Sequence, residues 1–313
     1  EIASYELEAS THGGSTTEDG SRSYVCQQSS FPNDKLLILD TSEITARKPG
    51  AEFKLIAEIP LMDNQWCQGA YRLTYGGKPF LIQYGERSSV NDCSMAEAGW
   101  ATYGYPRMYD LADERNPRLI STMLLETALP EHCDTVFGEG SQVSGFGYSA
   151  HHCTPDRLYD PTILACSWFG SGLRVMDIRD PYRPKELAYY SPGGASSATG
   201  TVARPVVRAD KREIWFTSAG GGGFYVVRFA EGVWPFEDSA PCPEANDYLF
   251  QQQNPTSTCA TAVMVPDKLL TSAPSAAVST TRFGAALALW NVLLMLLGAA
   301  LRLTRLPIRH RKD

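Results

Sequence analysis

A strand unit that recurs along the chain is the feature that most restricts its fold. Each copy is a short apolar strand that ends at or near an aspartate, and a polar loop then leads to a second strand. The apolar strands are Leu36–Asp40, Arg107–Leu111, Leu173–Ile178 and Phe224–Phe229, and the first three are followed by Phe53–Ile59, Asn116–Met123 and Arg183–Tyr189. The fourth copy lacks the aspartate. No segment before Val265 shows sustained helical periodicity, so the pattern predicts an all-β fold.

The residue types of the unit explain why an apolar strand, a turn and a second strand follow one another. The aspartate accepts hydrogen bonds from nearby backbone N–H groups, and a following proline, as in Asp180-Pro181, favours a turn. The second strand alternates polar and apolar residues, as an outer strand does. One such sheet cannot bury both of its faces, whereas several sheets stacked around an axis can. We therefore expect the blades of a β-propeller over residues 1–230.

The copies Leu36–Asp40 and Leu173–Pro184 resemble the LVIVD repeat of bacterial exported proteins. That resemblance covers roughly residues 1–230 and implies β-propeller blades. The aspartates of successive copies are 70 and 67 residues apart, which exceeds a blade of about 40–45 residues. Long insertions or a hidden degenerate blade are therefore expected. We interpret the chain as an N-terminally truncated fragment with about four blades, an incomplete ring and a remnant strand at residues 1–8.

The C-terminal end reads as a membrane anchor. Residues 283–301 form a run of nineteen residues without a charge, and as a helix it would span roughly 28 Å, close to a hydrocarbon core of about 30 Å. The basic tail 302–313 predicts a cytoplasmic C-terminus and an extracytoplasmic N-terminal domain at the cell membrane. Residues 265–282 read as a Ser/Thr/Ala/Pro stalk, and 231–264 as an irregular cysteine-containing extension. A sorting tail that is cleaved after export is the alternative.

The charge balance restricts the partners. The chain has 28 Lys and Arg against 35 Asp and Glu, and residues 1–301 keep 23 basic and 34 acidic side chains, a net charge of −11. Nucleic acids and anionic lipids repel such a field, so neither is expected to bind the folded part.

The eight cysteines form no C-x-x-C pair, which argues against a zinc ribbon and favours disulfides in an exported chain. A hairpin turn near Tyr159–Asp160 would place Cys153 opposite Cys166, within disulfide range. Cys242 and Cys259 flank one loop and form a second candidate pair. The remaining cysteines, Cys26, Cys67, Cys93 and Cys133, allow three pairings, and the sequence does not choose among them.

Among motifs that could carry chemistry, His151-His152-Cys153 stands out. On a regular strand His151 and Cys153 share one face and His152 faces away, so the two histidines could not bind one metal. We therefore predict no metal site, with His151 and His152 as the nearest candidates, and no catalytic residues. Ser149 has no nucleophile-elbow context. The pairs Gly13-Gly14 and Gly76-Gly77 are predicted to form hairpin turns.

These features favour a membrane-anchored extracytoplasmic propeller that binds an extracellular protein, polymer or small ligand without a cofactor. An extracellular propeller enzyme, a metal-assisted hydrolase or an oxidoreductase, is the alternative, and it would need convergent His, Asp or Glu side chains at the inner-strand ends.

Overall fold

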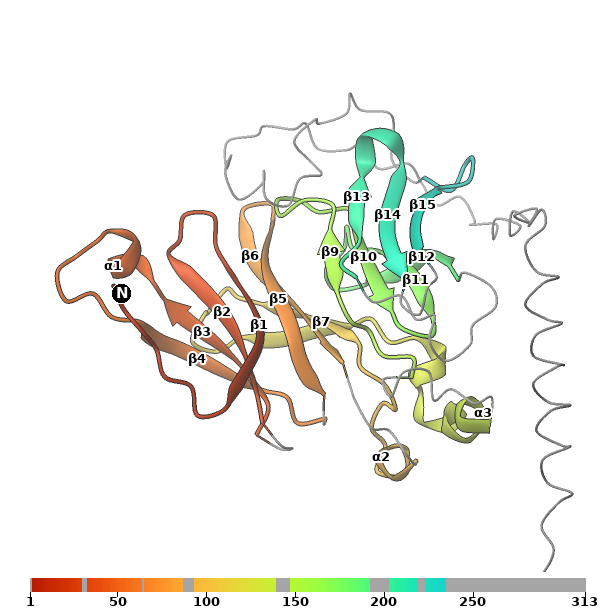
Figure 1. Ribbon diagram of the computed structural model, residues 1–313, viewed down its shortest axis with the longest axis horizontal. Helices are drawn as coiled ribbons and strands as arrows, with labels where there is room; N and C mark the ends of the chain where they lie inside the picture. Colours follow the sequence, from red (N-terminus) through yellow and green to blue (C-terminus); the bar gives the residue numbers. More distant parts are fainter. Residues whose placement is uncertain are drawn as a thin grey trace, which may run out of the picture. The chain divides into compact units, whose positions relative to one another are not determined.

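The computed structural model describes residues 2–29, 33–63, 65–86, 93–138, 147–191, 203–218 and 223–234. These residues form four antiparallel sheets that follow one another in chain order (Figure 1). The first sheet comprises β1 (Ser10–Thr16), β2 (Arg22–Gln28), β3 (Lys35–Asp40) and β4 (Lys54–Pro60). The second comprises β5 (Trp66–Tyr75), β6 (Lys78–Glu86), β7 (Pro106–Asp110) and β8 (Arg118–Thr122).

The third sheet comprises β9 (Cys153–Pro155), β10 (Ile163–Trp168), β11 (Gly172–Asp177) and β12 (Lys185–Tyr190). In the described residues the fourth sheet has three strands, β13 (Val206–Arg208), β14 (Glu213–Ser218) and β15 (Gly223–Arg228). Short helices lie between strands: α1 (Ser42–Thr45), α2 (Ser94–Glu97), η1 (Glu126–Ala128), η2 (Pro130–His132), α3 (Cys133–Gly138) and η3 (Ala209–Lys211). The all-β expectation is confirmed, and the four meander sheets have the form of propeller blades.

The sheets pack face to face because each inner strand is apolar on both sides. On β6, Leu81 belongs to a core shared with the first sheet, whereas Phe80 and Ile82 belong to a core shared with the third sheet. On β10, Leu164 faces the second sheet, and Ile163 packs with the fourth. Strands buried on both faces read as continuous apolar runs, which is the pattern of the repeats.

The recurring unit corresponds to the third and fourth strands of the first three sheets. The aspartates Asp40, Asp110 and Asp177 end the third strands, and each carboxylate accepts a hydrogen bond from the backbone N–H two residues later, at 2.9, 2.8 and 3.1 Å. Each copy also carries a register shift against the fourth strand that begins two residues before the aspartate, at Ile38, Met108 and Val175 in turn. The sequence predicted that these aspartates accept backbone hydrogen bonds in the turns, but it did not predict the register shift.

We expect Asp177→Ala to lower the free energy of unfolding by about 2 kcal/mol, because it removes the carboxylate that accepts hydrogen bonds from the N–H and the guanidinium of Arg179. Asp180→Ala is the matched control, since Asp180 is exposed and, among the described residues, its carboxylate accepts a hydrogen bond from the N–H of Tyr182 alone. Its expected cost is below about 1 kcal/mol. Guanidinium unfolding followed by tryptophan fluorescence measures both, and equal losses would show that the turn aspartate has no special role.

Long insertions account for the wide repeat spacing. The chain leaves β6 at Glu86 and enters β7 at Pro106, and it leaves β8 at Thr122 and enters β9 at Cys153. Cys93 and Cys133, one in each insertion, are joined by a disulfide. Because antiparallel neighbours alternate in direction, the end of β6 and the start of β9 lie at the same end of their sheets.

Two expectations for the N-terminal part were wrong. Residues 2–7 form no strand within the described part of the chain, where β1 begins at Ser10 and pairs with β2. Gly13 and Gly14 lie inside β1 at a register shift, not in a turn. A Cβ at Gly13 would clash with the backbone oxygen of Gln68, so glycine permits β1 to approach β5 closely. Gly76 and Gly77 do form the β5–β6 turn, both with positive φ.

Two further disulfides join cysteines of the first three sheets. Cys26–Cys67 joins β2 to β5, and Cys153–Cys166 is a cross-strand pair in the predicted register. Cys242 and Cys259 lie outside the described residues, as do the stalk, the predicted anchor 283–301 and the basic tail. Within the described ranges no helix has the length and apolar character needed to cross a membrane.

Candidate functional site

A buried carboxylate, Glu86, lies at the centre of a group of polar side chains contributed by the first two sheets and by the segment before β9. It ends β6 and is 2% exposed. Its Oε1 lies 3.7 Å from Nε2 of His12, and its Oε2 lies 3.5 Å from Nε2 of His151. Burial raises the pKa of Glu86 to about 7. A carboxyl that titrates near neutral pH can take up or release a proton under ordinary conditions.

The two adjacent histidines lie together, contrary to the expectation that they face apart. His151 N donates to the backbone oxygen of Ser167, and Ser167 N donates to the backbone oxygen of His152. Two residues thus oppose one, which is the geometry of a β-bulge. The bulge breaks the alternation of a regular strand, and the two imidazole centroids lie 4.1 Å apart. The strand β9 begins one residue later, at Cys153.

The surroundings of His152 disfavour its charged form. Burial first, and then the charges of His151, Arg204 and His12, lower its pKa to about 3. Its Nε2 lies 3.5 Å from Nε2 of Gln68, and its ring packs edge-on against Tyr84 with centroids 6.4 Å apart. His152 is therefore a neutral hydrogen-bonding group at physiological pH.

The site also holds polar atoms whose hydrogen-bonding capacity is not used within the described residues. These are Oε2 of Glu86, Oε1 of Gln68 and Nδ1 of His152. Buried polar atoms usually have partners, so a cluster of unpaired ones next to a carboxylate indicates a place that a ligand or water can occupy. This arrangement can bind a hydrogen-bonding ligand or transfer a proton.

The carboxylate oxygens of Glu86 separate the two histidines that flank it. The two histidines near Glu86 face different carboxylate oxygens. Among the described residues no group of three or more His, Cys, Asp or Glu side chains is arranged to hold a metal ion.

The elements that carry the site explain why sequence reasoning found only part of it. His151 and His152 were singled out as an unusual pair, but Glu86 and Gln68 were not. The available signal was one acidic residue at the end of the otherwise uncharged run Phe80–Glu86. Ser149 is fully buried, and its hydroxyl accepts a hydrogen bond from Gly104 N, which fits a structural role.

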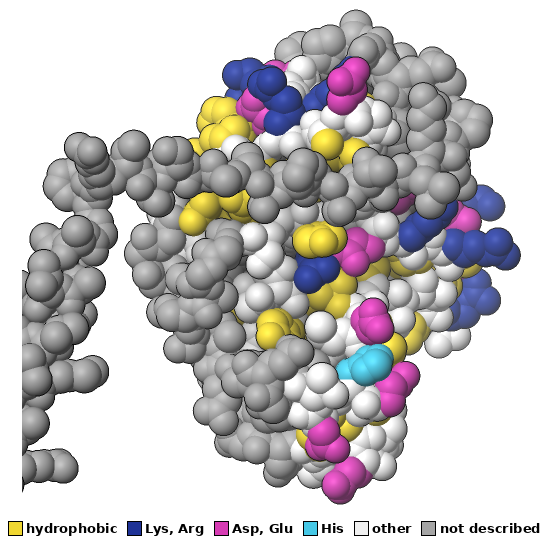
Figure 2. Space-filling model, turned by 90° about the vertical axis from the view of Figure 1, so that its right-hand side faces the viewer, with side chains coloured by type: hydrophobic (Ala, Val, Ile, Leu, Met, Phe, Trp, Pro, Cys, Tyr) yellow, Lys and Arg dark blue, Asp and Glu magenta, His cyan; other side chains and the backbone are white. Residues whose placement is uncertain are grey.

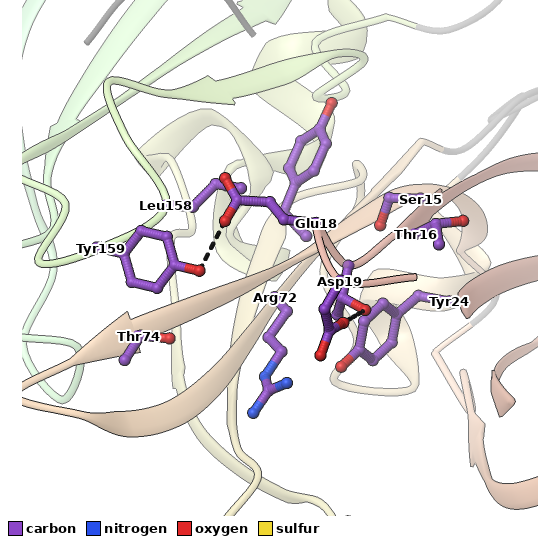
Figure 3. Close-up of a pocket in the computed structure, with 11 residues that line it drawn as sticks. Ser15, Thr16, Glu18, Asp19, Tyr24, Arg72, Thr74, Leu158 and Tyr159 are labelled. Carbon is purple, nitrogen blue, oxygen red and sulfur yellow. Dashed lines mark hydrogen bonds between the residues drawn. The ribbon is translucent and has the colours of Figure 1, made fainter. Parts of the chain in front are cut away.

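A second polar hollow lies at the opposite ends of β1 and β5. Ser15 Oγ donates to the backbone oxygen of Ala70 there, 2.6 Å away, and holds the two strands together. Figure 3 shows the residues that line this hollow, among them Glu18, Arg72 and Tyr159. From Trp66 beside Glu86 to Arg72, β5 advances roughly 20 Å, so the two places are separate.

Charged side chains are unevenly distributed over the face of the molecule shown in Figure 2. In the lower part of Figure 2, acidic side chains gather around a histidine, whereas most Lys and Arg side chains lie toward the upper and right-hand edges and one lies near the centre beside an acidic side chain. Hydrophobic side chains on this face form separated groups between polar ones.

Comparisons with known proteins identify no family. No protein-family model matches the chain, and no curated protein matches it. Similar solved structures include a functionally unknown protein from Desulfotomaculum acetoxidans, with 11% identity, a TM-score of 0.43 and coverage of 73% of this chain and 55% of that one. The WD40 domain of Toxoplasma gondii coronin matches with 10% identity, a TM-score of 0.42 and coverage of 72% and 46%. The chain thus spans about half the length of these proteins.

Proposed function

We propose that the chain is a surface-displayed binding module, an LVIVD-type propeller held at the outer face of a membrane by residues 283–301. Its ligand engages the inner-strand ends where Glu86, His12 and His151 meet. The observation that carries this proposal is the convergence of His12 from β1 and His151 from the segment before β9 on one buried carboxylate, beside polar atoms of Gln68 and His152 that form no hydrogen bond with any described residue. Loops and strand ends on a rigid sheet scaffold are where recognition commonly takes place.

The two insertions support the same location. Both connect strands at the end of the sheets where Glu86 lies, and the Cys93–Cys133 disulfide joins them. A cross-link between two loops reduces the number of conformations available before binding, which favours a preorganised surface. Extracellular proteins and polymers are the partners that such a surface fits.

A second candidate function is acid–base catalysis at the same place. The pKa of about 7 at Glu86 and the 3.5 Å separation from His151 favour it, because general acids and bases work best when their pKa lies near the operating pH. The two functions differ in one respect that can be measured. An enzyme converts a bound substrate, whereas a binding module returns it unchanged.

The experiment uses the full chain reconstituted in liposomes with its N-terminal domain outside, tested against a panel of extracellular polysaccharides and matrix proteins. We expect one class to be retained, and His151→Ala to weaken retention about tenfold. His132→Ala is the matched control, because His132 also lies close to a glutamate, 3.7 Å from Glu126, but at the surface. Equal retention by the wild type and His151→Ala, or no retention at all, would contradict the proposed site.

The anchor is tested separately in cells. Deletion of residues 283–301 should release the protein from the membrane fraction, and the full chain should be labelled by a membrane-impermeant amine reagent added outside. Membrane association that survives the deletion would place the attachment elsewhere.

A further inference from the structure

We propose that the hollow at the Arg72 end of the inner strands binds a neutral polyhydroxylated ligand, such as one sugar unit of a glycan. This site is additional to the one at Glu86. It is lined by Ser15–Asp19, by Tyr24, by Tyr71, Arg72 and Thr74 of β5, and by Leu158 and Tyr159 (Figure 3). Its volume of about 200 Å³ lies below the range of about 300–1,000 Å³ typical of drug-sized ligands, so it suits one small unit rather than a large molecule.

The walls are held by backbone hydrogen bonds. Thr74 N donates to the backbone oxygen of Leu158 at 2.9 Å, and Asp160 N donates to that of Thr74 at 2.7 Å. The Asp160 carboxylate also accepts from Gly76 N at 2.7 Å. The turn that carries Leu158 and Tyr159 is thereby fastened to the end of β5. The hollow is consequently preformed, as ligand sites usually are.

Two polar groups in this hollow have no hydrogen-bond partner among the residues that the structure describes. Tyr24 is 0% exposed, and its hydroxyl makes no hydrogen bond with any described residue. Nε of Arg72 is buried and also unpaired within the described ranges. Figure 3 shows the Tyr24 hydroxyl and the Arg72 guanidinium turned toward the same space beside Asp19. A buried polar group without a partner costs about 1–3 kcal/mol, and a ligand that pairs with it removes that cost.

The carboxylates of Asp19 and Glu18 restrict the charge of a ligand that can bind in the hollow. Asp19 is already occupied, since its oxygens accept from the Thr17 hydroxyl at 2.6 Å and from Ser21 N and Oγ at 3.0 and 2.8 Å. The Thr17 hydroxyl is the main reason that the pKa of Asp19 is lowered, so Asp19 stays charged. Glu18 accepts from the Tyr159 hydroxyl through Oε2 at 2.7 Å. The two carboxylates outnumber the one arginine of the hollow and so repel an anion, whereas a cation cannot pair with the buried Nε of Arg72, which is positively charged and can only donate.

A neutral ligand that carries both hydrogen-bond donors and acceptors can pair with the polar groups of this hollow. Its hydroxyls can accept from the Tyr24 hydroxyl and from Nε of Arg72, and they can donate to the second carboxylate oxygen of Glu18. Burial raises the pKa of Glu18, which shows that this carboxyl lies partly out of water, where such a bond is stronger. The half-exposed ring of Tyr159 supplies an apolar surface for the C–H face of a sugar.

The test uses the full chain in detergent micelles and saturation-transfer NMR with methyl β-glucoside, methyl β-galactoside and methyl α-mannoside, beside glucuronate and glucosamine. We expect a neutral glycoside to bind more tightly than the two charged sugars. Tyr24→Phe and Arg72→Gln should each weaken it about tenfold. Tyr24→Phe keeps the core ring and removes an unpaired hydroxyl, so its fold is preserved. Arg115→Gln, an exposed arginine outside the hollow, should bind as the wild type does.

Three results would overturn the proposal. Tighter binding of glucuronate or glucosamine would refute the ligand class. Absence of binding by every sugar at about 50 mM, far above a millimolar dissociation constant, would refute the site. An unchanged affinity in both Tyr24→Phe and Arg72→Gln would place the sugar elsewhere. His151→Ala should leave the sugar affinity unchanged. The experiment therefore distinguishes a wrong proposal for the Glu86 site from a wrong proposal for the sugar site at Arg72.

Discussion

Replacing Glu86 with glutamine is expected to stabilise the protein by about 3 kcal/mol at pH 8 and to leave its stability nearly unchanged at pH 4. The cause is the burial of the carboxylate, whose side chain is 3% exposed. In the folded protein its pKa is about 7, well above the ordinary value of 4.5 that applies in the unfolded chain. At pH 8 folding must therefore bury a charge, and glutamine removes that charge while keeping the shape.

The sign of the pH dependence follows from the raised pKa. Glu86 contributes stability that is fully present below about pH 4.5 and is lost as the pH rises through 7. His152 acts in the opposite direction, because its pKa is lowered to about 3. Its contribution is present above about pH 6.5 and is lost as the pH falls toward 3. The wild type should therefore lose stability both as the pH rises through 7 and as it falls toward 3. The Glu86→Gln variant should lose stability only as the pH falls.

Urea unfolding at a series of pH values between 4 and 8 measures this difference. Glu126→Gln is the matched control, since Glu126 also lies 3.7 Å from a histidine but its side chain is 84% exposed. Its stability should follow that of the wild type at every pH. A Glu86→Gln variant that is less stable than the wild type at pH 8 would show that attraction to His12 and His151 outweighs the cost of burial.

Local signals in the sequence predicted the parts of the fold that depend on near neighbours. The third and fourth strands of the first three sheets were found because an apolar run, an aspartate turn and a polar-alternating strand follow one another within about 25 residues. The Cys153–Cys166 register followed from one hairpin turn. In each case the interacting groups are close in sequence, so the chain order alone restricts their geometry.

The candidate sites depend on which sheets become neighbours, and the sequence carries little information about that. His12, Glu86 and His151 come from β1, β6 and the segment before β9, and they meet only because the sheets stack in order. The bulge at His151 also escaped prediction, because it arises from pairing with Ser167 rather than from the residues themselves. The same holds for Gly13, whose role is the close approach of β1 to Gln68.

Removing the Cys26–Cys67 disulfide, by replacing both cysteines with alanine, is expected to lower the free energy of unfolding by about 4 kcal/mol. The bond closes a loop of 41 residues, and loop-closure entropy predicts about this value. The Cys153–Cys166 bond closes only 13 residues, so the same model predicts a loss of about 3 kcal/mol for its removal. Both pairs are fully buried, which makes the second double variant a matched control.

Denaturant unfolding of the two double variants ranks the losses. A larger loss for Cys153 and Cys166 would show that local packing beside Trp168, not loop closure, determines the contribution of these bonds. The Cys26–Cys67 variant should also differ in a second respect. Cys67 adjoins Gln68, and the bond joins the first sheet, which carries His12, to the second sheet, which carries Glu86. Loosening that junction should shift the neutral-pH titration of Glu86 toward its ordinary value, because water then reaches the carboxylate.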